Sequence, residues 1–161
     1  MLDVVSRGEP RRARRSATRA RGAGLHGADN GRVEPWEMRE WHAEYLDACN
    51  RHDLDAIRSF IDPSVRRAHL PGGADAWIAD MADLFDAFPD WRWRRIQLIA
   101  EDDRVAVHLR GGGTHLGAFR GIAATRRHVN VAEFAMYRVS RGRIAEFTGT
   151  DHVELLGQIT G

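Results

Sequence analysis

The sequence predicts an α+β domain over residues 34–161, in which helices pack on one face of an antiparallel sheet. Two observations lead to this prediction. Before Pro89, apolar residues recur every three or four positions, which is the spacing of one face of a helix. From Trp91 onward they alternate with other residues, as they do in strands. Helices followed by consecutive strands are typical of the α+β class.

Three helices are expected in the first half of the domain. Pro35 suits a first helical turn, where its missing N–H costs nothing. Asp53 is a suitable cap for a short second helix, which Pro63 would stop. A turn at residues 70–73 precedes the third helix, which ends at Pro89. The apolar faces of the three helices comprise Met38, Trp41, Tyr45, Ala48 and Cys49, then Leu54, Ile57, Phe60 and Ile61, then Trp77, Met81, Leu84, Phe85 and Phe88.

One short strand is expected before the third helix and four longer strands after it. Turn signals at residues 101–103 and 140–142 join neighbouring strands as antiparallel hairpins. A short helix or turn at residues 155–159 closes the domain. The expected strands are residues 65–69, 91–100, 104–111, 129–139 and 143–150.

The expected strand at residues 129–139 has apolar side chains on both faces. Val131 and Ala135 lie on one face, and Phe134 and Met136 lie on the other. A sheet face in contact with water should be mostly polar. We therefore expect a second copy of the chain to cover the outer face, which would make the protein a homodimer.

Residues 1–33 form an arginine-rich segment that we expect to be a disordered tail. Up to residue 32 it holds eight arginines against three acidic residues, with few large apolar side chains that could offset the entropy of ordering. Three roles stay open: a dispensable extension upstream of a start near Met38, a binding or regulatory arm, and a targeting segment. Nucleic acid is not the favoured partner, because no aromatic residue interleaves the arginines. The apolar core of a secretory signal is also missing.

Composition limits the remaining possibilities. No stretch approaches the roughly 20 apolar residues of a membrane span. The single cysteine, Cys49, rules out an internal disulfide and a cysteine-based metal cluster. No convincing metal-ligand spacing exists among His42, His52, Asp53 and Asp55. We expect a soluble, cytoplasmic protein without a metal site.

Short motifs occur in a fixed order along the domain. They are Phe-Pro-Asp-Trp-Arg-Trp at residues 88–93, the strand–turn–strand segment at 98–107, and Gly-Thr-His-Leu-Gly at 113–117, followed by segments 137–139, 142–146 and 155–159. This series resembles the SnoaL-like polyketide cyclases of the NTF2-like superfamily over residues 38–161. The resemblance implies a cone-shaped barrel around a hydrophobic cavity, usually in a dimer. It also implies a cofactor-free enzyme that closes a ring of an aromatic polyketide ester by intramolecular aldol condensation.

The acid/base pair of this family is not matched. The aspartate that the family carries on the last strand falls at Thr148 or Gly149, and the histidine on the preceding strand falls at Ala135. A polar glutamine of the family aligns with Glu133. The resemblance therefore supports a ligand pocket more directly than it supports ring closure.

Three residues are candidates for catalysis in place of that pair. Glu133 lies among apolar residues of the predicted cavity face, where desolvation raises a carboxyl pKa toward the range of a general base; the alternative is a glutamate paired with arginine. Asp151 is either a pocket carboxylate or a cap of the closing helix. His69 either holds a substrate carbonyl or relays a proton, or it lies on the surface.

Further residues are candidates for binding an aromatic substrate. Arg67 shares the short strand with His69, and His115 belongs to the Gly-Thr-His motif, where a structural hydrogen bond is the alternative. The other candidates are aromatic residues that belong first to the core and could also line a cavity: Trp41, Tyr45, Phe60, Trp77, Phe85 and Tyr137.

Two classes of function are expected. The first is a cofactor-independent tailoring enzyme for an aromatic polyketide, which acts by cyclisation or by the hydroxylation-type step known from relatives that also lack the pair. The second is a non-catalytic small-molecule binding protein. Epoxide hydrolysis, which relatives perform with an Asp-Arg-Asp arrangement, ranks last because residues 129–139 contain no Asp-x-Arg or Arg-x-Asp pattern.

Overall fold

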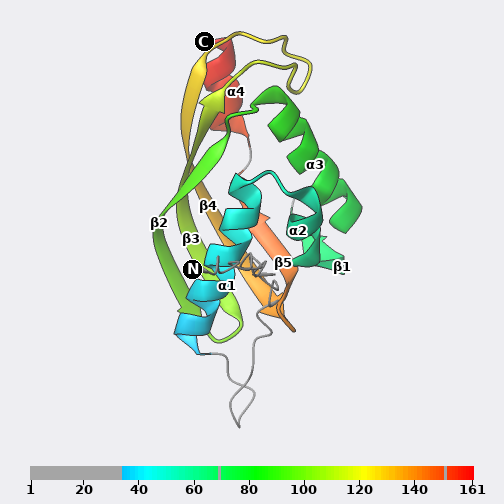
Figure 1. The fold of residues 1–161 in the computed structure, drawn as a ribbon, viewed down its shortest axis with the longest axis vertical. Helices are drawn as coiled ribbons and strands as arrows, with labels where there is room; N and C mark the ends of the chain where they lie inside the picture. The colour runs from blue at the N-terminus through cyan, green and yellow to red at the C-terminus, as the bar shows by residue number, and fades with distance from the viewer. Residues whose placement is uncertain (1–33, 69, 151) are drawn as a thin grey trace, which may run out of the picture.

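The computed structural model describes residues 34–68, 70–150 and 152–161, so the expected tail at residues 1–33 lies outside the described residues. Helices and strands follow one another in the order that the sequence predicts (Figure 1). The elements are α1 (Pro35–Asn50), α2 (Leu54–Ser59), β1 (Ile61–Arg67), α3 (Ala74–Ala87), β2 (Arg92–Glu101), β3 (Arg104–Thr114), β4 (His128–Ser140), β5 (Arg143–Gly149) and α4 (Val153–Thr160).

The strands form one five-stranded sheet in the order β1-β5-β4-β3-β2. The pairs from β2 to β5 are antiparallel, as expected, but β1 runs parallel to β5. The expectation of a purely antiparallel sheet is therefore wrong at this edge. The reason is connectivity: β1 lies between α2 and α3, so no hairpin links it to β5.

The start of β1 also differs from the expectation. α2 begins at the predicted cap, because the Asp53 carboxylate accepts a hydrogen bond from the Ala56 N–H at 2.9 Å. The helix ends at Ser59, however, and Pro63 lies inside β1 instead of stopping the helix. Proline is tolerated there because β1 is an edge strand, where an N–H can be lost without breaking the sheet.

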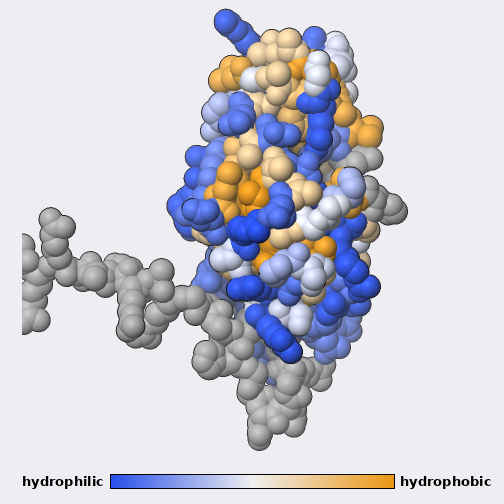
Figure 2. All heavy atoms as spheres, turned by 90° about the vertical axis from the view of Figure 1, so that its right-hand side faces the viewer, coloured by the Kyte–Doolittle hydropathy of each residue, from blue (hydrophilic) through white to orange (hydrophobic). Residues whose placement is uncertain are grey.

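Helices α1, α2 and α3 cover one face of the sheet, and this side holds the main core (Figure 1). A second core lies at the end of the sheet near α4, around the fully buried Phe88, Trp91 and Phe119. Apolar surface also remains in the middle of the α3 side of the molecule, bordered by hydrophilic residues (Figure 2).

The short helix α4 completes the free edge of β4. Pairing of β4 with β5 begins only at Ala135, so the first half of β4 has no strand beside it on that side. Side chains of α4 take the place of a strand: Gln158 bonds both the N–H and the C=O of Asn130, and Glu154 accepts from the Ala132 N–H. These bonds satisfy backbone groups that an open edge would expose.

The opposite face of the sheet carries large exposed apolar residues. Ile99, Phe134 and Met136 are between 48% and 59% exposed, and the ring of His108 stacks on Phe134 with 4.5 Å between centroids. No described helix covers this part of the sheet (Figure 1). Within the described region, none of the helices has the length and apolarity that a bilayer span requires.

Candidate active site

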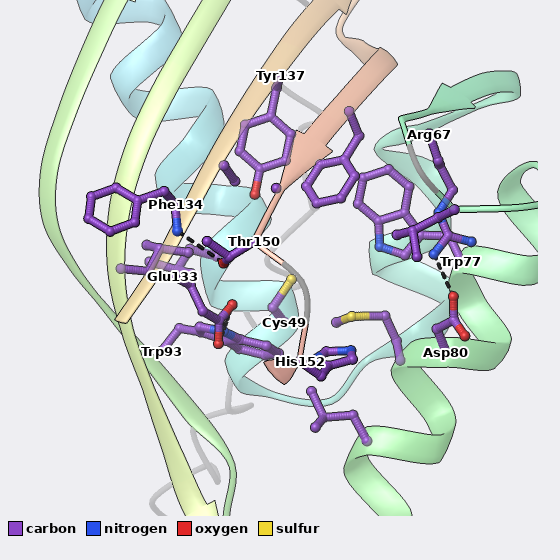
Figure 3. Close-up of a pocket in the computed structure, with 18 of the residues that line it drawn as sticks. Cys49, Arg67, Trp77, Asp80, Trp93, Glu133, Phe134, Tyr137, Thr150 and His152 are labelled. Carbon is purple, nitrogen blue, oxygen red and sulfur yellow. Dashed lines mark hydrogen bonds and ion pairs between the residues drawn. The ribbon is translucent and has the colours of Figure 1, made fainter. Parts of the chain in front are cut away.

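A pocket lies between the sheet and the helices α1 and α3 (Figure 3). It encloses about 130 Å³, which is room for roughly one aromatic ring. A larger ligand would therefore have to extend out of the opening. The lining residues are Tyr45, Leu46, Cys49, Arg67, Leu70, Trp77, Asp80, Met81, Leu84, Trp93, Leu109, Arg120, Glu133, Phe134, Ala135, Tyr137, Phe147, Gly149, Thr150 and His152.

The carboxyl group of Glu133 forms one side of the pocket. Glu133 lies on β4, and Trp93 lies on β2, with β3 between them. The indole Nε1–H of Trp93 donates to both carboxyl oxygens of Glu133 at 3.0 Å. Gly111 makes this placement possible, because a Cβ at that position would come within 2.5 Å of Glu133 Oε1 and 2.8 Å of Trp91 Cζ2. The glycine on β3 thus leaves space for a carboxyl group on the face of the sheet that the helices cover.

The surroundings of Glu133 change its acidity. Burial raises the pKa of Glu133 to about 7, although the hydrogen bond from Trp93 acts to lower it. The charge of Glu154 adds a smaller raising effect. Among the described residues no arginine forms an ion pair with Glu133. Its carboxyl group can therefore both take up and release a proton near neutral pH.

Three further acidic groups lie near Glu133, and all of them stay protonated. Burial raises the pKa of Cys49 to about 12 and holds the pKa of Tyr45 and Tyr137 well above the usual tyrosine range. Tyr45 and Cys49 share a side-chain hydrogen bond. The hydroxyl of Tyr137 is thus available as a neutral donor on the same side of the pocket as Glu133 (Figure 3).

The opposite side of the pocket carries charge (Figure 3). The Arg67 guanidinium pairs with Asp80 on α3, and Arg120 Nη2 lies 3.1 Å from the other oxygen of Asp80. Burial acts to raise the pKa of Asp80, but hydrogen bonds from the two arginines outweigh it and hold that pKa below its ordinary value. The guanidinium carbon of Arg67 lies 5.5 Å from the ring centroid of Trp77, in cation–π contact.

The structure brings five of the predicted site residues together. Glu133, Tyr45, Tyr137, Arg67 and Trp77 all line the pocket, although they come from four different elements. Two of the predicted catalytic residues, His69 and Asp151, lie outside the described residues.

Four predicted binding residues lie outside the pocket lining. Trp41 and Phe60 pack in the main core, where Trp41 Nε1 donates to the carbonyl of Gly142 at 3.0 Å. The ring of Phe85 stacks on His52 at 3.8 Å between centroids. His115 is fully buried in the other core, stacked on Phe88. Its Nδ1 lies 3.0 Å from Thr125 Oγ1, as the structural alternative for this histidine predicts.

Sequence reasoning did not select Trp93, Asp80, Arg120 or His152 as site residues. Asp80 had a usable signal, because it lies three residues after Trp77 and four before Leu84, inside an apolar helical stripe. Arg120 had none: it reaches the pocket from a two-residue turn in which Phe119 and Ile122 exchange backbone hydrogen bonds.

The comparison with protein families gives one match. The model of the SnoaL-like polyketide cyclases matches residues 40–159, about three quarters of the chain. No curated protein matches the chain.

Solved structures with the same fold include proteins from several bacteria. AclR of Streptomyces galilaeus, described as a proposed hydroxylase, is 25% identical with a TM-score of 0.71 over 78% of this chain and 82% of its own. IdmH of Streptomyces antibioticus, described as a proposed polyketide cyclase, is 27% identical with a TM-score of 0.65 over 76% and 98%. A SnoaL-like protein of Jannaschia is 23% identical with a TM-score of 0.70 over 79% and 94%. The predicted NTF2-like α+β fold is confirmed.

Proposed function

The chain belongs to the SnoaL-like polyketide cyclase family, and we propose that it is a cofactor-independent enzyme that acts on an aromatic polyketide, with Glu133 as its general base. One observation carries the proposal: the carboxyl group of Glu133, with a pKa of about 7, lies in a pocket lined mainly by aromatic and aliphatic side chains. A general base works best when its pKa lies near the working pH.

An aldol condensation uses these groups as follows. The Glu133 carboxylate removes a proton from a carbon next to a carbonyl, and the electron pair of the broken C–H bond forms an enolate. The enolate carbon attacks a second carbonyl of the same molecule, so that a C–C bond closes a ring and an alkoxide forms. The alkoxide takes the proton back from Glu133. The Tyr137 hydroxyl, which stays protonated, is a suitable donor to the developing oxyanion.

The names of similar structures support this class of reaction and leave its type open. IdmH is described as a proposed polyketide cyclase, which supports ring closure. AclR is described as a proposed hydroxylase, which supports a hydroxylation-type step as the second candidate.

A non-catalytic binding protein is the competing function. The family resemblance places the acid/base residues of the cyclases at Ala135 and at Thr148 or Gly149, and none of these three residues supplies a carboxylate or an imidazole. Ala135 and Gly149 line the pocket. A pocket that has kept its shape and lost this pair could bind a ligand without converting it.

The substitution Glu133→Gln separates the two functions. It keeps the size of the side chain but cannot take up a proton, so turnover of an aromatic β-keto ester should fall by about 10²–10⁴-fold while ligand affinity changes only a few-fold. Tryptophan fluorescence measures affinity, because Trp77 and Trp93 line the pocket. Glu44→Gln on the exposed face of α1 is the matched control. Full activity of Glu133→Gln would remove Glu133 from the mechanism, and a wild type that binds without turnover would favour the binding protein.

A further inference from the structure

Two nitrogen atoms of Arg67 are buried without a hydrogen-bond partner among the described residues. They are Nε and Nη1, while Nη2 pairs with Asp80. The side chain of Arg67 is only 3% exposed. A buried donor that lacks a partner costs about 1–3 kcal/mol, and more when the group is charged. Two such atoms on one pocket residue therefore indicate that something other than the described side chains accepts these bonds.

Among the described residues that line the pocket, the charges around Arg67 do not balance. Two guanidinium groups, Arg67 and Arg120, share the single carboxylate of Asp80. Of the other carboxyl groups in the described part of the chain, the one that lines the pocket is that of Glu133, which lies on the opposite side (Figure 3). The Arg67 side of the pocket thus carries one excess positive charge in a largely apolar wall, where an opposite charge would bind with little competition from water.

The groups at this end of the pocket suit a carboxylate that is attached to an aromatic ring. Trp77 provides an aromatic surface beside the Arg67 guanidinium. A guanidinium group presents its donors in a planar fork that matches the two oxygens of a carboxylate.

Arg120 is held at this end by an unusual backbone conformation. Its φ is +48°, in the left-handed region, and the following Gly121 also has a positive φ of 83°. Such a pair forms a tight two-residue turn, and here the turn directs a non-glycine residue to Asp80.

We infer that the pocket binds an aromatic ligand with a free carboxylate, which pairs with Arg67 and Arg120 while the ring extends toward Glu133. Binding of the carboxylate depends only on the two arginines. That the ring is the part of the ligand that reacts rests on the proposed function. The substrate would then be an acid, in contrast to the ester that the family resemblance implies.

The test compares an acid with its neutral ester. We would measure the affinity of benzoate and of methyl benzoate by calorimetry near pH 6, where Glu133 is mostly protonated. The wild type should bind the acid at least about tenfold more tightly than the ester, which corresponds to about 1.4 kcal/mol. Added salt should weaken the binding of the acid and leave the binding of the ester unchanged. Equal affinity for acid and ester, or no binding of either, would overturn the inference.

Substitutions at both arginines sharpen the test. Arg120→Gln is the main variant, because Arg120 is 42% exposed and its loss leaves the Arg67–Asp80 pair in place. It should lose about tenfold in affinity for benzoate and keep its affinity for the ester. Arg67→Lys keeps the positive charge but removes the planar pair of donors. It should therefore also weaken the binding of the acid more than the binding of the ester. Arg94→Gln, an exposed arginine of β2 outside the pocket, is the matched control. Equal losses for acid and ester in Arg120→Gln would contradict the inference.

The preference of the pocket for the acid over the ester does not depend on catalysis. Glu133→Gln should keep the preference for the acid, because its side chain lies on the other side of the pocket. If the acid preference holds and Glu133→Gln keeps full turnover, the proposed function fails and the carboxylate site stands. If the preference is absent and Glu133→Gln abolishes turnover, the carboxylate site fails and the proposed function stands.

Discussion

The indole Nε1 of Trp93 lies 3.0 Å from both carboxyl oxygens of Glu133. One donor therefore serves two acceptor atoms, and both residues line the pocket. The bond favours the charged carboxylate, whereas burial favours the neutral acid. The acidity of Glu133 is the balance of these two effects, so a change in either should move its pKa in a known direction.

Replacing Trp93 with phenylalanine should raise the pKa of Glu133 above its present value of about 7. The substitution keeps an aromatic ring but removes the N–H that stabilises the carboxylate. Loss of a hydrogen bond to a charged group is worth about 1.5–3 kcal/mol, or roughly one to two pH units. The measurement is the pH at which turnover rises to half its maximum, or a carboxyl titration by nuclear magnetic resonance. An unchanged midpoint would show that the bond does not control this pKa.

The stability of the protein should fall with rising pH because of Glu133. An unfolded glutamate has a pKa of 4.5, whereas Glu133 in the fold has one of about 7. Between these values the folded state keeps a proton that the unfolded state has released, so the free energy of unfolding decreases as pH rises and levels off above about 7. The whole effect is roughly 3 kcal/mol.

Urea unfolding of wild type and Glu133→Gln at several pH values checks this expectation. Glutamine cannot ionise, so the variant should gain stability relative to wild type as pH rises from 4.5 to 8. If the stabilities of the two proteins differed by the same amount at every pH in this range, the pKa of Glu133 would not be raised in the folded state.

His42 should have the opposite effect on stability. It is fully buried beside Trp41, Tyr45 and Tyr137, and burial together with the charge of Arg95 lowers its pKa from 6.5 to about 4. Between these values the unfolded state binds the proton and the folded state does not. The free energy of unfolding should therefore rise with pH from about 4 to 6.5, by roughly 3 kcal/mol.

The variant His42→Gln isolates this contribution. The variant should be less stable than the wild type at neutral pH, because a core residue is changed. This difference in the free energy of unfolding should become smaller as pH falls toward 4. Urea unfolding at pH 4.5 and 7 measures it. Since Glu133 and His42 act in opposite directions between pH 4.5 and 6.5, the wild type itself should show a nearly flat response there. A wild-type advantage that is the same at both pH values would contradict the low pKa of His42.

The order of the elements could be predicted from the sequence because each one has its own local signal. Helical spacing marks α1 and α3, the Asp53 cap marks α2, and alternation with turns marks the strands from β2 to β5. The direction of β1 could not be predicted, since it depends on how the chain crosses the sheet and not on the residues of the strand.

The site was predictable on one side only. Glu133 could be found because a carboxylate on the inner face of an apolar strand is uncommon. The charged side depends on contacts between Arg67, Asp80 and Arg120, which lie 13 and 40 residues apart along the chain. Such a cluster has no periodicity or motif, and only the folded arrangement of β1, α3 and the turn at Arg120 brings it together.

The outer face of the sheet leads to the last prediction. We propose that two copies of the chain associate through this face, which exposes Ile99, Phe134 and Met136 along the groove between β2 and β5. Exposed apolar clusters of this kind are typical of interaction surfaces. These side chains do not belong to the core. On β4, the core residues are Val131 and Tyr137, which are buried on the inner face of the sheet.

Replacing Phe134 or Met136 with aspartate should dissociate such a dimer, because an unpaired charge in a buried contact costs several kcal/mol. Size-exclusion chromatography with light scattering measures the mass of each variant. Since both side chains are about half exposed in the single chain, the variants should still fold, which circular dichroism can check. Ala43→Asp on the exposed side of α1 is the control for an added surface charge and should keep the wild-type mass. A monomeric wild type would contradict the proposal, and the apolar groove would then need another partner.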